Sequence, residues 1–389
     1  MTIAFWFIFF IIVYAYVGYF AIMWLVSSFF PARDIDKSTN IYEPTVSLIV
    51  AAYNEEGVVI KKLANSAEID YSRNKIEQIW VTDGSTDASV AILSANKEIK
   101  LLHLPERMGK INAINRAVSF AKNDIIIFSD ANSMLSTNVV KEIVSIFSNP
   151  KVGCVAGSKQ VVNGTVDNQA MGEGLYWEYE ALLKKFESKI GSTIGAAGEL
   201  FAIRRELFEI VEPDTILDDF VIAMRVALKG YYVKYADRAL AVEVQSASIV
   251  DEMKRKIRIS AGGFQTLFRM SQLHNPFKQI GLVFKFYSHK VLRWLVVPFV
   301  LPLLLLLNFI IVHFNDYTPS IYLLMLVLQI CFYILALAGN FLPKNRFMPR
   351  WLFFPYYFLI VNYCQVLGLI RYLNKKQSVK WEKATRASN

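Results

Sequence analysis

Acidic and amide side chains stand at three points of the chain where an apolar run ends. The run 125–128 leads into Asp130 and Asn132, and the sequences YNEE (53–56) and DGSTD (83–87) follow two earlier apolar runs. Carboxylate and amide oxygens bind hard divalent cations, and carboxylates also accept protons in catalysis. One such cluster could simply cap a helix, but three clusters after three apolar runs predict a binding site.

Strand-like and helix-like segments alternate around these clusters. We expect strands at 45–53, 76–83, 99–105 and 124–131, and helices at 55–68, from 85 onward, at 110–122 and at 137–147. This alternation predicts an α/β domain with a parallel sheet covered by helices on both faces. Because ligands bind at the carboxyl ends of parallel strands, the three polar clusters are expected to share one crevice. No G-x-G-x-x-G follows the first strand and no P-loop pattern occurs, which disfavours these two kinds of phosphate site.

The ends of the chain are too apolar for an ordinary soluble protein. Of the 389 residues 54% are hydrophobic, and the mean hydropathy is +0.34. Residues 1–32 carry no charge, and charge-free stretches return at 294–312, 321–342 and 351–370. Each is near the roughly 20 residues that a helix needs to cross a bilayer. A cleaved signal peptide is disfavoured because residues 1–32 lack a basic first region.

The distribution of charge divides the chain further. We expect an N-terminal transmembrane helix (1–32), a connector (33–44), a cytoplasmic α/β domain (45–247), interfacial amphipathic helices (248–290), about three transmembrane helices (291–373) and a basic tail (374–389). The net charge of +9 does not indicate nucleic acid, because the basic residues crowd beside the apolar stretches and so place the domain in the cytoplasm. Three C-terminal crossings would put the basic tail outside, against its charge. Either the segment around Pro355 does not cross fully, or the rule fails here.

Six motifs, taken in order, resemble those of family 2 inverting glycosyltransferases. They are VSLIVAAYNEE, VTDGSTD, RMGKINAIN, FSDAN, GAAGELFAIRR and ILDDF, and with their surroundings they cover residues 45 to about 270. The resemblance is to membrane-embedded members that include cellulose, chitin, hyaluronan and poly-N-acetylglucosamine synthases. It implies a glycosyltransferase A-type fold in a bacterial-type plasma membrane, with a UDP-sugar as donor.

The same resemblance assigns the donor site. The residues that it places at the nucleotide-sugar are Tyr53 and Asn54 at the uracil, Glu55 at the ribose, Asp83 at the base, Lys110 near the nucleotide, and Asp130 at the diphosphate. Asp130 would hold Mg²⁺ or Mn²⁺ against the diphosphate. The family pattern is D-x-D, and here Asn132 takes the third position, where its amide can ligate a metal without adding charge.

The resemblance also assigns the acceptor side. Gly198 and Glu199 belong to the segment that lines the acceptor site, and LDDF (217–220) takes the place of the motif that ends in the catalytic base. By that match Asp219 would deprotonate the acceptor hydroxyl, with Asp218 beside it. An alternative is that both carboxylates cap the helix that follows, and the two roles can coexist.

One departure from the family concerns the motif Q-x-x-R-W. The chain has RKIRI (255–259) at this place. Arg255 and Arg258 could still clamp the diphosphate, for which a guanidinium is well suited, but the tryptophan under the acceptor sugar is missing. Trp177 could replace it, although an aromatic there could also pack its helix against a neighbour. A basic amphipathic helix lying on anionic lipid is the other interpretation of 248–290.

These features together predict a membrane-embedded transferase of hexose or N-acetylhexosamine, acting on a growing cell-surface polysaccharide or glycan. The partners expected are the donor, the acceptor, membrane lipid and proteins of polysaccharide export, with no nucleic acid. A single-addition enzyme acting on a polyprenyl- or lipid-linked acceptor is the alternative within the same class. A transporter or channel with a regulatory domain is disfavoured, because the predicted membrane helices contain no charge.

Overall fold

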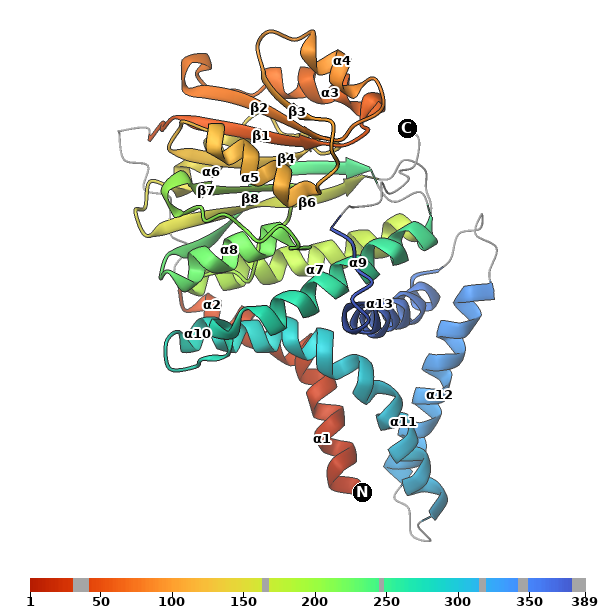
Figure 1. Ribbon diagram of the computed structural model, residues 1–389. Coiled ribbons are helices and arrows are strands. Elements are labelled where there is room, and N and C mark those ends of the chain that lie inside the picture. The colour runs from red at the N-terminus through yellow and green to blue at the C-terminus, as the bar shows by residue number, and fades with distance from the viewer. Residues whose placement is uncertain (31–41, 163–167, 245–247, 315–319, 342–348, 380–389) are drawn as a thin grey trace.

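The computed structural model describes residues 1–30, 42–162, 168–244, 248–314, 320–341 and 349–379. An α/β domain forms one end of the molecule, and the apolar helices α1, α11 and α12 extend away from it (Figure 1). Most of the expected connector (33–44) and basic tail (374–389) lies outside the described residues.

The first half of the sheet is parallel, as predicted. Its strands are β1 (Val46–Ala52), β2 (Ile76–Asp83), β3 (Lys100–Leu104) and β4 (Ile125–Asp130), arranged in the order β3-β2-β1-β4. β1 is buried along its whole length and β4 nearly so, which explains their continuous apolar sequences. The pairing sets Ala51 of β1 beside Asp130 and Thr82 beside Ala52. The polar residues that follow β1, β2 and β4 therefore meet at one edge.

The second half of the sheet adds antiparallel pairings to the predicted parallel sheet. It contains β5 (Met134–Leu135), β6 (Val152–Val162), β7 (Leu200–Arg204) and β8 (Tyr232–Val244), and the full order is β3-β2-β1-β4-β7-β6-β8-β5. β7 runs antiparallel to both β4 and β6. The direction of β7 is set by pairing with strands far away in sequence, which local periodicity does not record.

Helices cover both faces of this sheet. They are α3 (Glu56–Ala67), α4 (Ser89–Ser94), α5 (Lys110–Phe120), α6 (Val139–Ile146), α7 (Asn168–Ile190) and α8 (Asp218–Leu228). One core lies on each face. In one of them the rings of Phe128 and Phe201 stack with centroids 4.5 Å apart across β4 and β7. Trp80 and Phe147 fill the other, so both faces of the sheet are fully packed.

Helices outside the α/β domain make up most of the rest of the described chain. They are α1 (Thr2–Val13), α2 (Tyr19–Ser28), α9 (Ile249–Arg269), α10 (Ile280–Phe286), the π-helical η5 (Tyr287–Val296), α11 (Val297–Phe314), α12 (Ser320–Phe341) and α13 (Arg350–Leu373). Four stretches are long and apolar enough to cross a membrane: Thr2–Ser28, Ile280–Phe314, Ser320–Gly339 and Trp351–Leu373. They overlap with the charge-free stretches of the sequence, although Ile280–Phe314 also contains Lys285, Lys290 and Arg293. The protein is therefore a membrane protein.

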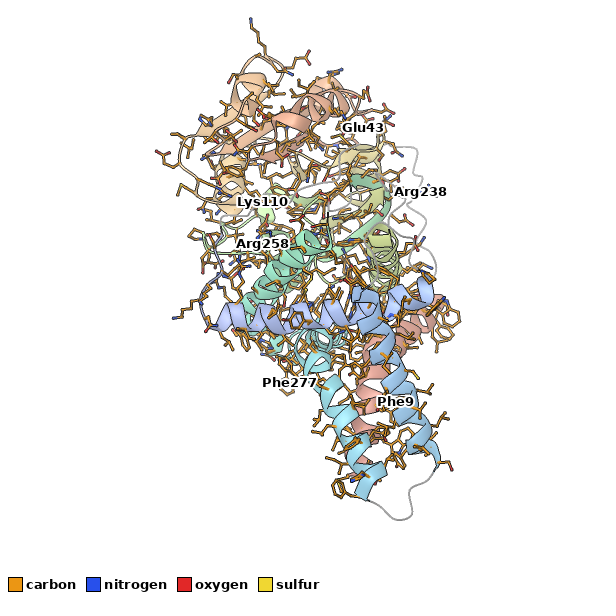
Figure 2. All side chains as sticks on the ribbon, turned by 90° about the vertical axis from the view of Figure 1, so that its right-hand side faces the viewer. Phe9, Glu43, Lys110, Arg238, Arg258 and Phe277 are labelled. Atoms are coloured by element: carbon orange, nitrogen blue, oxygen red, sulfur yellow. The ribbon has the colours of Figure 1, made fainter. Side chains whose placement is uncertain are left out.

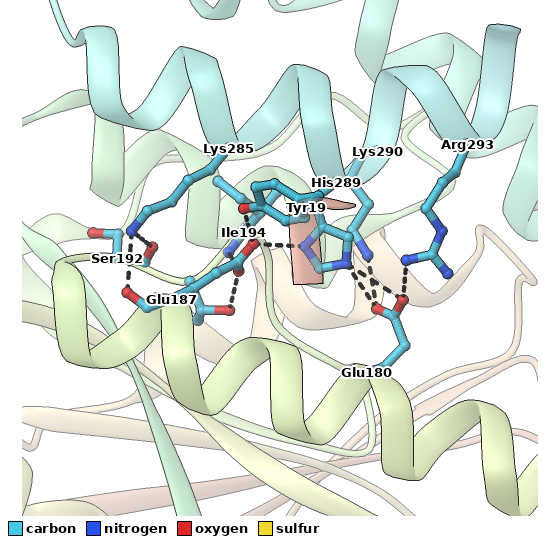
Figure 3. A network of polar contacts seen from close by, with 10 residues as sticks. Tyr19, Glu180, Glu187, Ser192, Ile194, Lys285, His289, Lys290 and Arg293 are labelled. Carbon is cyan, nitrogen blue, oxygen red and sulfur yellow. Dashed lines mark hydrogen bonds and ion pairs between the residues drawn. The ribbon is translucent and has the colours of Figure 1, made fainter. Parts of the chain in front are cut away.

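Two carboxylates of α7 are buried against the start of the long helix 280–314 (Figure 3). The Nδ1 atom of His289 lies 2.8 Å from Glu187 Oε1, and its Nε2 atom lies 3.1 Å from Glu180 Oε2. Both ring nitrogens of His289 therefore lie within hydrogen-bonding distance of a carboxylate. Lys290 and Arg293 also pair with Glu180, at 2.9 and 2.7 Å.

The N-terminal helix joins the same network. The hydroxyl of Tyr19 in α2 donates to Glu187 Oε1 at 2.6 Å. Burial by itself raises the pKa of Glu187, but His289 and Tyr19 hold it at about 2. Glu187 is therefore ionised at neutral pH, and its contacts bind the α/β domain, α2 and η5 into one unit (Figure 3).

Loss of Glu180 is expected to loosen this unit. Glu180→Ala leaves His289, Lys290 and Arg293 without their shared partner, and an unpaired buried charge costs about 3–5 kcal/mol of stability. We expect a clearly lower melting temperature of the detergent-solubilised protein, measured by intrinsic fluorescence. Glu98→Ala is the control, because the Glu98 side chain is 77% exposed and lies 4.0 Å from Arg73. Equal melting temperatures for the two variants would contradict a stabilising role.

Candidate active site

The loops that follow β1 and β2 are tied to each other at the carboxyl edge of the sheet. Asn54 has a left-handed backbone with φ of 52°, and its Oδ1 atom accepts from the Thr86 amide at 2.8 Å. The Glu56 amide donates to Asp87 Oδ2 at 3.0 Å, and Glu56 Oε2 accepts from the Ala88 amide at 3.0 Å. Two of the polar clusters therefore form one rim.

Asp83 holds the loop that precedes α5. It is buried, and its two oxygens accept from the amides of Met108 at 2.8 Å and Gly109 at 2.7 Å. Gly109 has a φ of 99°, a conformation that suits only glycine, and Lys110 follows it as the first residue of α5. Asp83, which the sequence predicts to bind the nucleobase of the donor, therefore also fixes the position of Lys110.

Tyr53 and Glu55 lie on the same rim. The guanidinium of Arg107 is stacked on the Tyr53 ring, 3.9 Å from its centroid. The amide of Glu55 donates to Ser89 Oγ at 2.8 Å. Sequence reasoning missed Arg107, although it stands in the RMGK motif. A guanidinium stacked on a phenol ring offers a flat cationic surface for an aromatic base or a phosphate.

Four of the predicted residues converge on one point. The ammonium of Lys110 lies 2.6 Å from Asp130 Oδ1. A Cβ atom at Gly198 would lie 3.1 Å from Lys110 Nζ and 3.3 Å from Asp219 Oδ2. Lys110, Asp130 and Gly198 also line a small pocket. The residues predicted for the donor and for the acceptor therefore share one centre, and a side chain at position 198 would crowd Lys110 and Asp219.

Asp219 has the properties of a general base. Burial raises its pKa, the neighbouring charge of Asp218 raises it further, and Lys110 opposes both, with a result of about 7. Its Oδ1 atom accepts from the Phe220 amide at 2.7 Å. Asp218 is buried, and its Oδ2 atom has no hydrogen-bond partner in the described part of the chain. Asp219 can therefore gain and lose a proton near neutral pH.

Asp130 and Asn132 offer oxygen ligands to a divalent cation. Burial raises the pKa of Asp130, and Lys110 opposes that effect. Asn132 is half-buried beside it. Within the described ranges no group of three or more His, Cys, Asp or Glu side chains could hold a metal. The donor set nevertheless fits Mg²⁺ or Mn²⁺, which are often held by one or two carboxylates together with phosphate oxygens of a substrate.

The two arginines of α9 are placed differently. Arg258 is acted on by the charges of Asp218, Asp219 and Asp130, and its Nε atom is buried without a hydrogen-bond partner among the described residues. Figure 2 shows it on α9, on the side of the domain where Lys110 lies. Arg255 instead pairs with Glu252 at 3.0 Å. The structure therefore brings Arg258 to the site and engages Arg255 within its own helix.

A buried lysine organises the acceptor side. Lys159 of β6 pairs with Glu199, and with Glu243 at 2.7 Å. Its ammonium lies 4.7 Å from the ring centroid of Trp177, whose indole N–H is buried and has no partner in the described ranges. Glu199 and Trp177, the predicted acceptor residues, are thus joined through Lys159. Nothing in the sequence singled out Lys159, because its strand context gives no sign of a charge inside the domain.

A second buried lysine was also missed. Lys62 of α3 is fully buried and donates to Ser129 Oγ at 2.9 Å and to the carbonyl of Ser133. These two serines flank the Asp130–Asn132 segment. Burial lowers the pKa of Lys62 to about 7, and the charge of Asp130 acts against that effect. Lys62 therefore holds the segment 129–133 in place from inside the domain. Its sequence context, a helix, suggests instead an ordinary lysine exposed to solvent.

The C-terminal segment also reaches this site. A Cβ atom at Gly109 would lie 3.1 Å from the carbonyl oxygen of Val379. The chain therefore returns to the α/β domain after α13 ends at Leu373. The sequence analysis gave no role to this part of the basic tail.

Comparisons with known proteins agree with this geometry. Residues 47–211 match the model of glycosyl transferase family 2. The chain is 24% identical over 274 residues to the poly-beta-1,6-N-acetyl-D-glucosamine synthase of Staphylococcus aureus strain MSSA476. It is 25% identical over 234 residues to the synthase of the same name from Staphylococcus epidermidis, covering 58% of this chain and 56% of that one. The first alignment covers 65% of each chain, so the chain spans slightly less than two thirds of that relative.

A solved structure shares the fold over nearly the whole chain. It is a mannosyltransferase from Pyrobaculum calidifontis in complex with GDP-Man and Mn²⁺, with a TM-score of 0.70 and 19% sequence identity. The match covers 95% of this chain and 99% of that one. The predicted glycosyltransferase A-type fold is thereby confirmed, with its apolar helices included.

The raised pKa of Asp219 gives an expected pH profile. A base must be ionised to accept a proton, so kcat/KM for sugar transfer should fall about tenfold per pH unit below pH 7 and level off above it. Asp218→Asn removes a negative charge that raises the pKa of Asp219, so its acid limb should move to lower pH. The measurement is transfer at low donor concentration across pH 5–9. Superimposable profiles for the variant and the natural chain would refute this coupling.

Gly198→Ala tests the convergence of Lys110 and Asp219. The added methyl group would crowd both side chains, and displacement of reacting groups costs on the order of 10- to 100-fold in rate. The melting temperature should change little, because both neighbours are side-chain ends that can shift. Gly57→Ala is the matched control, since a Cβ atom there meets nothing within 4 Å. If both variants keep full activity, the centre lies elsewhere.

Proposed function

We propose that this chain is a membrane-embedded inverting glycosyltransferase that transfers a sugar from a UDP-sugar to a growing cell-surface glycan. The single observation that carries the proposal is the meeting of Lys110 and Asp219 at Gly198, with Asp130 paired to the same lysine. A cation for a leaving diphosphate and a base for an attacking hydroxyl are thus held in one centre, and inverting transfer uses both, on opposite sides of the anomeric carbon.

The mechanism follows from these positions. Asp219 takes the proton of an acceptor hydroxyl, whose oxygen attacks the anomeric carbon of the donor from the face opposite the nucleotide. The bond from that carbon to the diphosphate breaks, and UDP leaves with the electron pair. Lys110 and Arg258 lie where they can balance the charge on the departing diphosphate. A divalent ion held by Asp130 and Asn132 would supply further neutralisation of that group.

The relatives suggest an N-acetylhexosamine as the transferred sugar. The staphylococcal relatives are named poly-beta-1,6-N-acetyl-D-glucosamine synthases. Trp177 offers an aromatic face and an unpaired N–H to an acceptor sugar next to Glu199 and Lys159, which is a combination suited to carbohydrate. The domain is placed in the cytoplasm, where nucleotide-sugars are available. Proteins of polysaccharide export are the expected partners.

A second candidate is a single-addition enzyme that acts on a polyprenyl- or lipid-linked acceptor. The observation that favours it is the half-buried Ile259, which stands where polymer synthases of this family have a tryptophan. A processive enzyme must hold its product between additions, and isoleucine offers no aromatic face for that purpose.

Transfer itself can be tested with membranes that contain the chain. Of radiolabelled UDP-N-acetylglucosamine, UDP-glucose and GDP-mannose, we expect a UDP-sugar to be incorporated, and excess chelator to stop the reaction. Asp219→Asn should lose roughly 10²–10⁴-fold in rate while UDP still binds. Asp70→Asn is the control, because the Asp70 side chain is exposed and paired to Lys141. Full activity of Asp219→Asn would contradict the role of Asp219 as the base. Incorporation from GDP-mannose alone would contradict a UDP-sugar as the donor.

Product length separates the two candidates. Arg258→Ala should abolish turnover with any acceptor, because its partner is the donor diphosphate. Trp177→Ala should keep initial turnover and shorten the products, as resolved by gel electrophoresis of labelled material. Trp351→Ala, which removes an exposed tryptophan of α13, serves as the control. A single product size in the natural chain would favour the lipid-linked acceptor, and unchanged turnover in Arg258→Ala would remove that residue from the site.

A further inference from the structure

α13 lies differently from the other long apolar helices. α1, α11 and α12 run away from the α/β domain, whereas α13 runs across beneath it, nearly end-on in Figure 1 and lengthwise in Figure 2. It packs along α9: Ser260 Oγ donates to Gln365 Oε1 at 2.7 Å, and the rings of Phe268 and Tyr372 stack 5.6 Å apart. A Cβ atom at Gly368 would lie 2.2 Å from Ser260 Oγ, so the two helices touch closely.

The end of the chain shows on which side α13 finishes. α13 ends at Leu373, and the carbonyl of Val379 contacts Gly109 in the α/β domain. The six residues between these points span at most about 20 Å when fully extended. The hydrocarbon core of a bilayer is about 30 Å thick. The chain cannot leave a membrane-crossing α13 on the far side and return to Gly109 within that length.

α13 carries exposed apolar side chains along its whole length. Its exposed large side chains are Trp351, Phe354, Tyr363, Ile370 and Leu373. Other side chains of the helix, among them Phe353, Tyr357 and Cys364, are buried against the rest of the protein. At the C-terminal end Lys375 and Lys376 are exposed. An apolar stripe with tryptophan and tyrosine, followed by lysines, is the pattern of a helix that lies in the surface of an anionic membrane.

The loop before α10 lies at the same level. Phe277 is 97% exposed and Ile280 is 74% exposed, and both figures place this region near the height at which α11 leaves the domain. α9 itself is covered by α13, since Ser260 and Phe268 are in contact with that helix. The sequence predicted that residues 248–290 face the lipid. In the structure α13 takes part of that position.

We propose that α13 is an interfacial helix, with its exposed side in the headgroup layer of an anionic lipid surface, and that it does not cross the membrane. The chain then crosses three times, through 2–28, 280–314 and 320–339. The C-terminus lies on the same side as the α/β domain, which agrees with the charge of the tail. This inference does not depend on the sugar, the donor or the acceptor.

Depth measurements in lipid nanodiscs test the proposal. Spin labels at Phe354→Cys, Tyr363→Cys and Ile370→Cys, in a Cys331→Ser background, should all report shallow positions by oxygen and nickel accessibility. The outer two positions are about 24 Å apart along the helix, so a crossing α13 would put Tyr363 near the bilayer centre. Labels at Leu323, Ile330 and Leu337 of α12 are the control, with the middle one expected to be deep. A deep Tyr363 label overturns the proposal.

Labelling of intact cells gives an independent test. In the same background, Asn374→Cys should resist a membrane-impermeant maleimide until the cells are opened, as should Ser94→Cys in the α/β domain. Ser320→Cys, at the opposite end of α12, should react in intact cells. All three positions are exposed in the structure. Reaction of Asn374→Cys together with Ser320→Cys in intact cells would place the C-terminus on the far side and refute the interfacial helix.

Discussion

Two buried carboxylates of α7 join the α/β domain to the membrane helices. Glu180 and Glu187 are removed from water, so each must keep its cationic and hydroxyl partners on η5 and α2. This requirement fixes the position of α7 against the membrane region. α7 also carries Trp177, so the acceptor side of the site is positioned by the same contacts. The site is therefore not a property of the sheet alone.

The electrostatics of the site depend on a few charges sharing a small volume. Lys110 pairs with Asp130 and lies close to Asp219. The charge of one lysine therefore acts on both carboxylates. Burial and Asp218 raise the pKa of Asp219 to about 7, which leaves it able to act as a base at neutral pH. Lys62 and Lys159 hold the surrounding segments in place from inside the domain. Buried charges of this kind are costly unless paired, and each of these has found partners.

Ile259, which replaces the tryptophan of the polymer-synthase motif, lies close to both the candidate site and α13. Ile259 lies in α9, between the arginine that reaches the site and the face that meets α13. With α13 beneath α9, one helix separates Arg258 from the lipid surface proposed above. A lipid-linked acceptor that approaches from the membrane would pass this region, and so would a polymer that leaves through the membrane. Whether the proposed enzyme makes a single addition or a polymer then depends on what binds to the aromatic face of Trp177.

The sequence by itself determined the local features. Apolar runs set strands β1 to β4, the polar clusters marked the edge where Asp83 and Asp130 lie, and the charge-free stretches marked the four apolar helices. Each of these is encoded within a few neighbouring residues. The tertiary structure alone decided the antiparallel β7, the burial of Lys62 and Lys159, the engagement of Arg255 with Glu252, and the course of α13. These depend on contacts between residues far apart in the chain. A lysine or an apolar helix has the same local sequence pattern whether it meets solvent, lipid or a buried carboxylate, so only the folded arrangement distinguishes the cases.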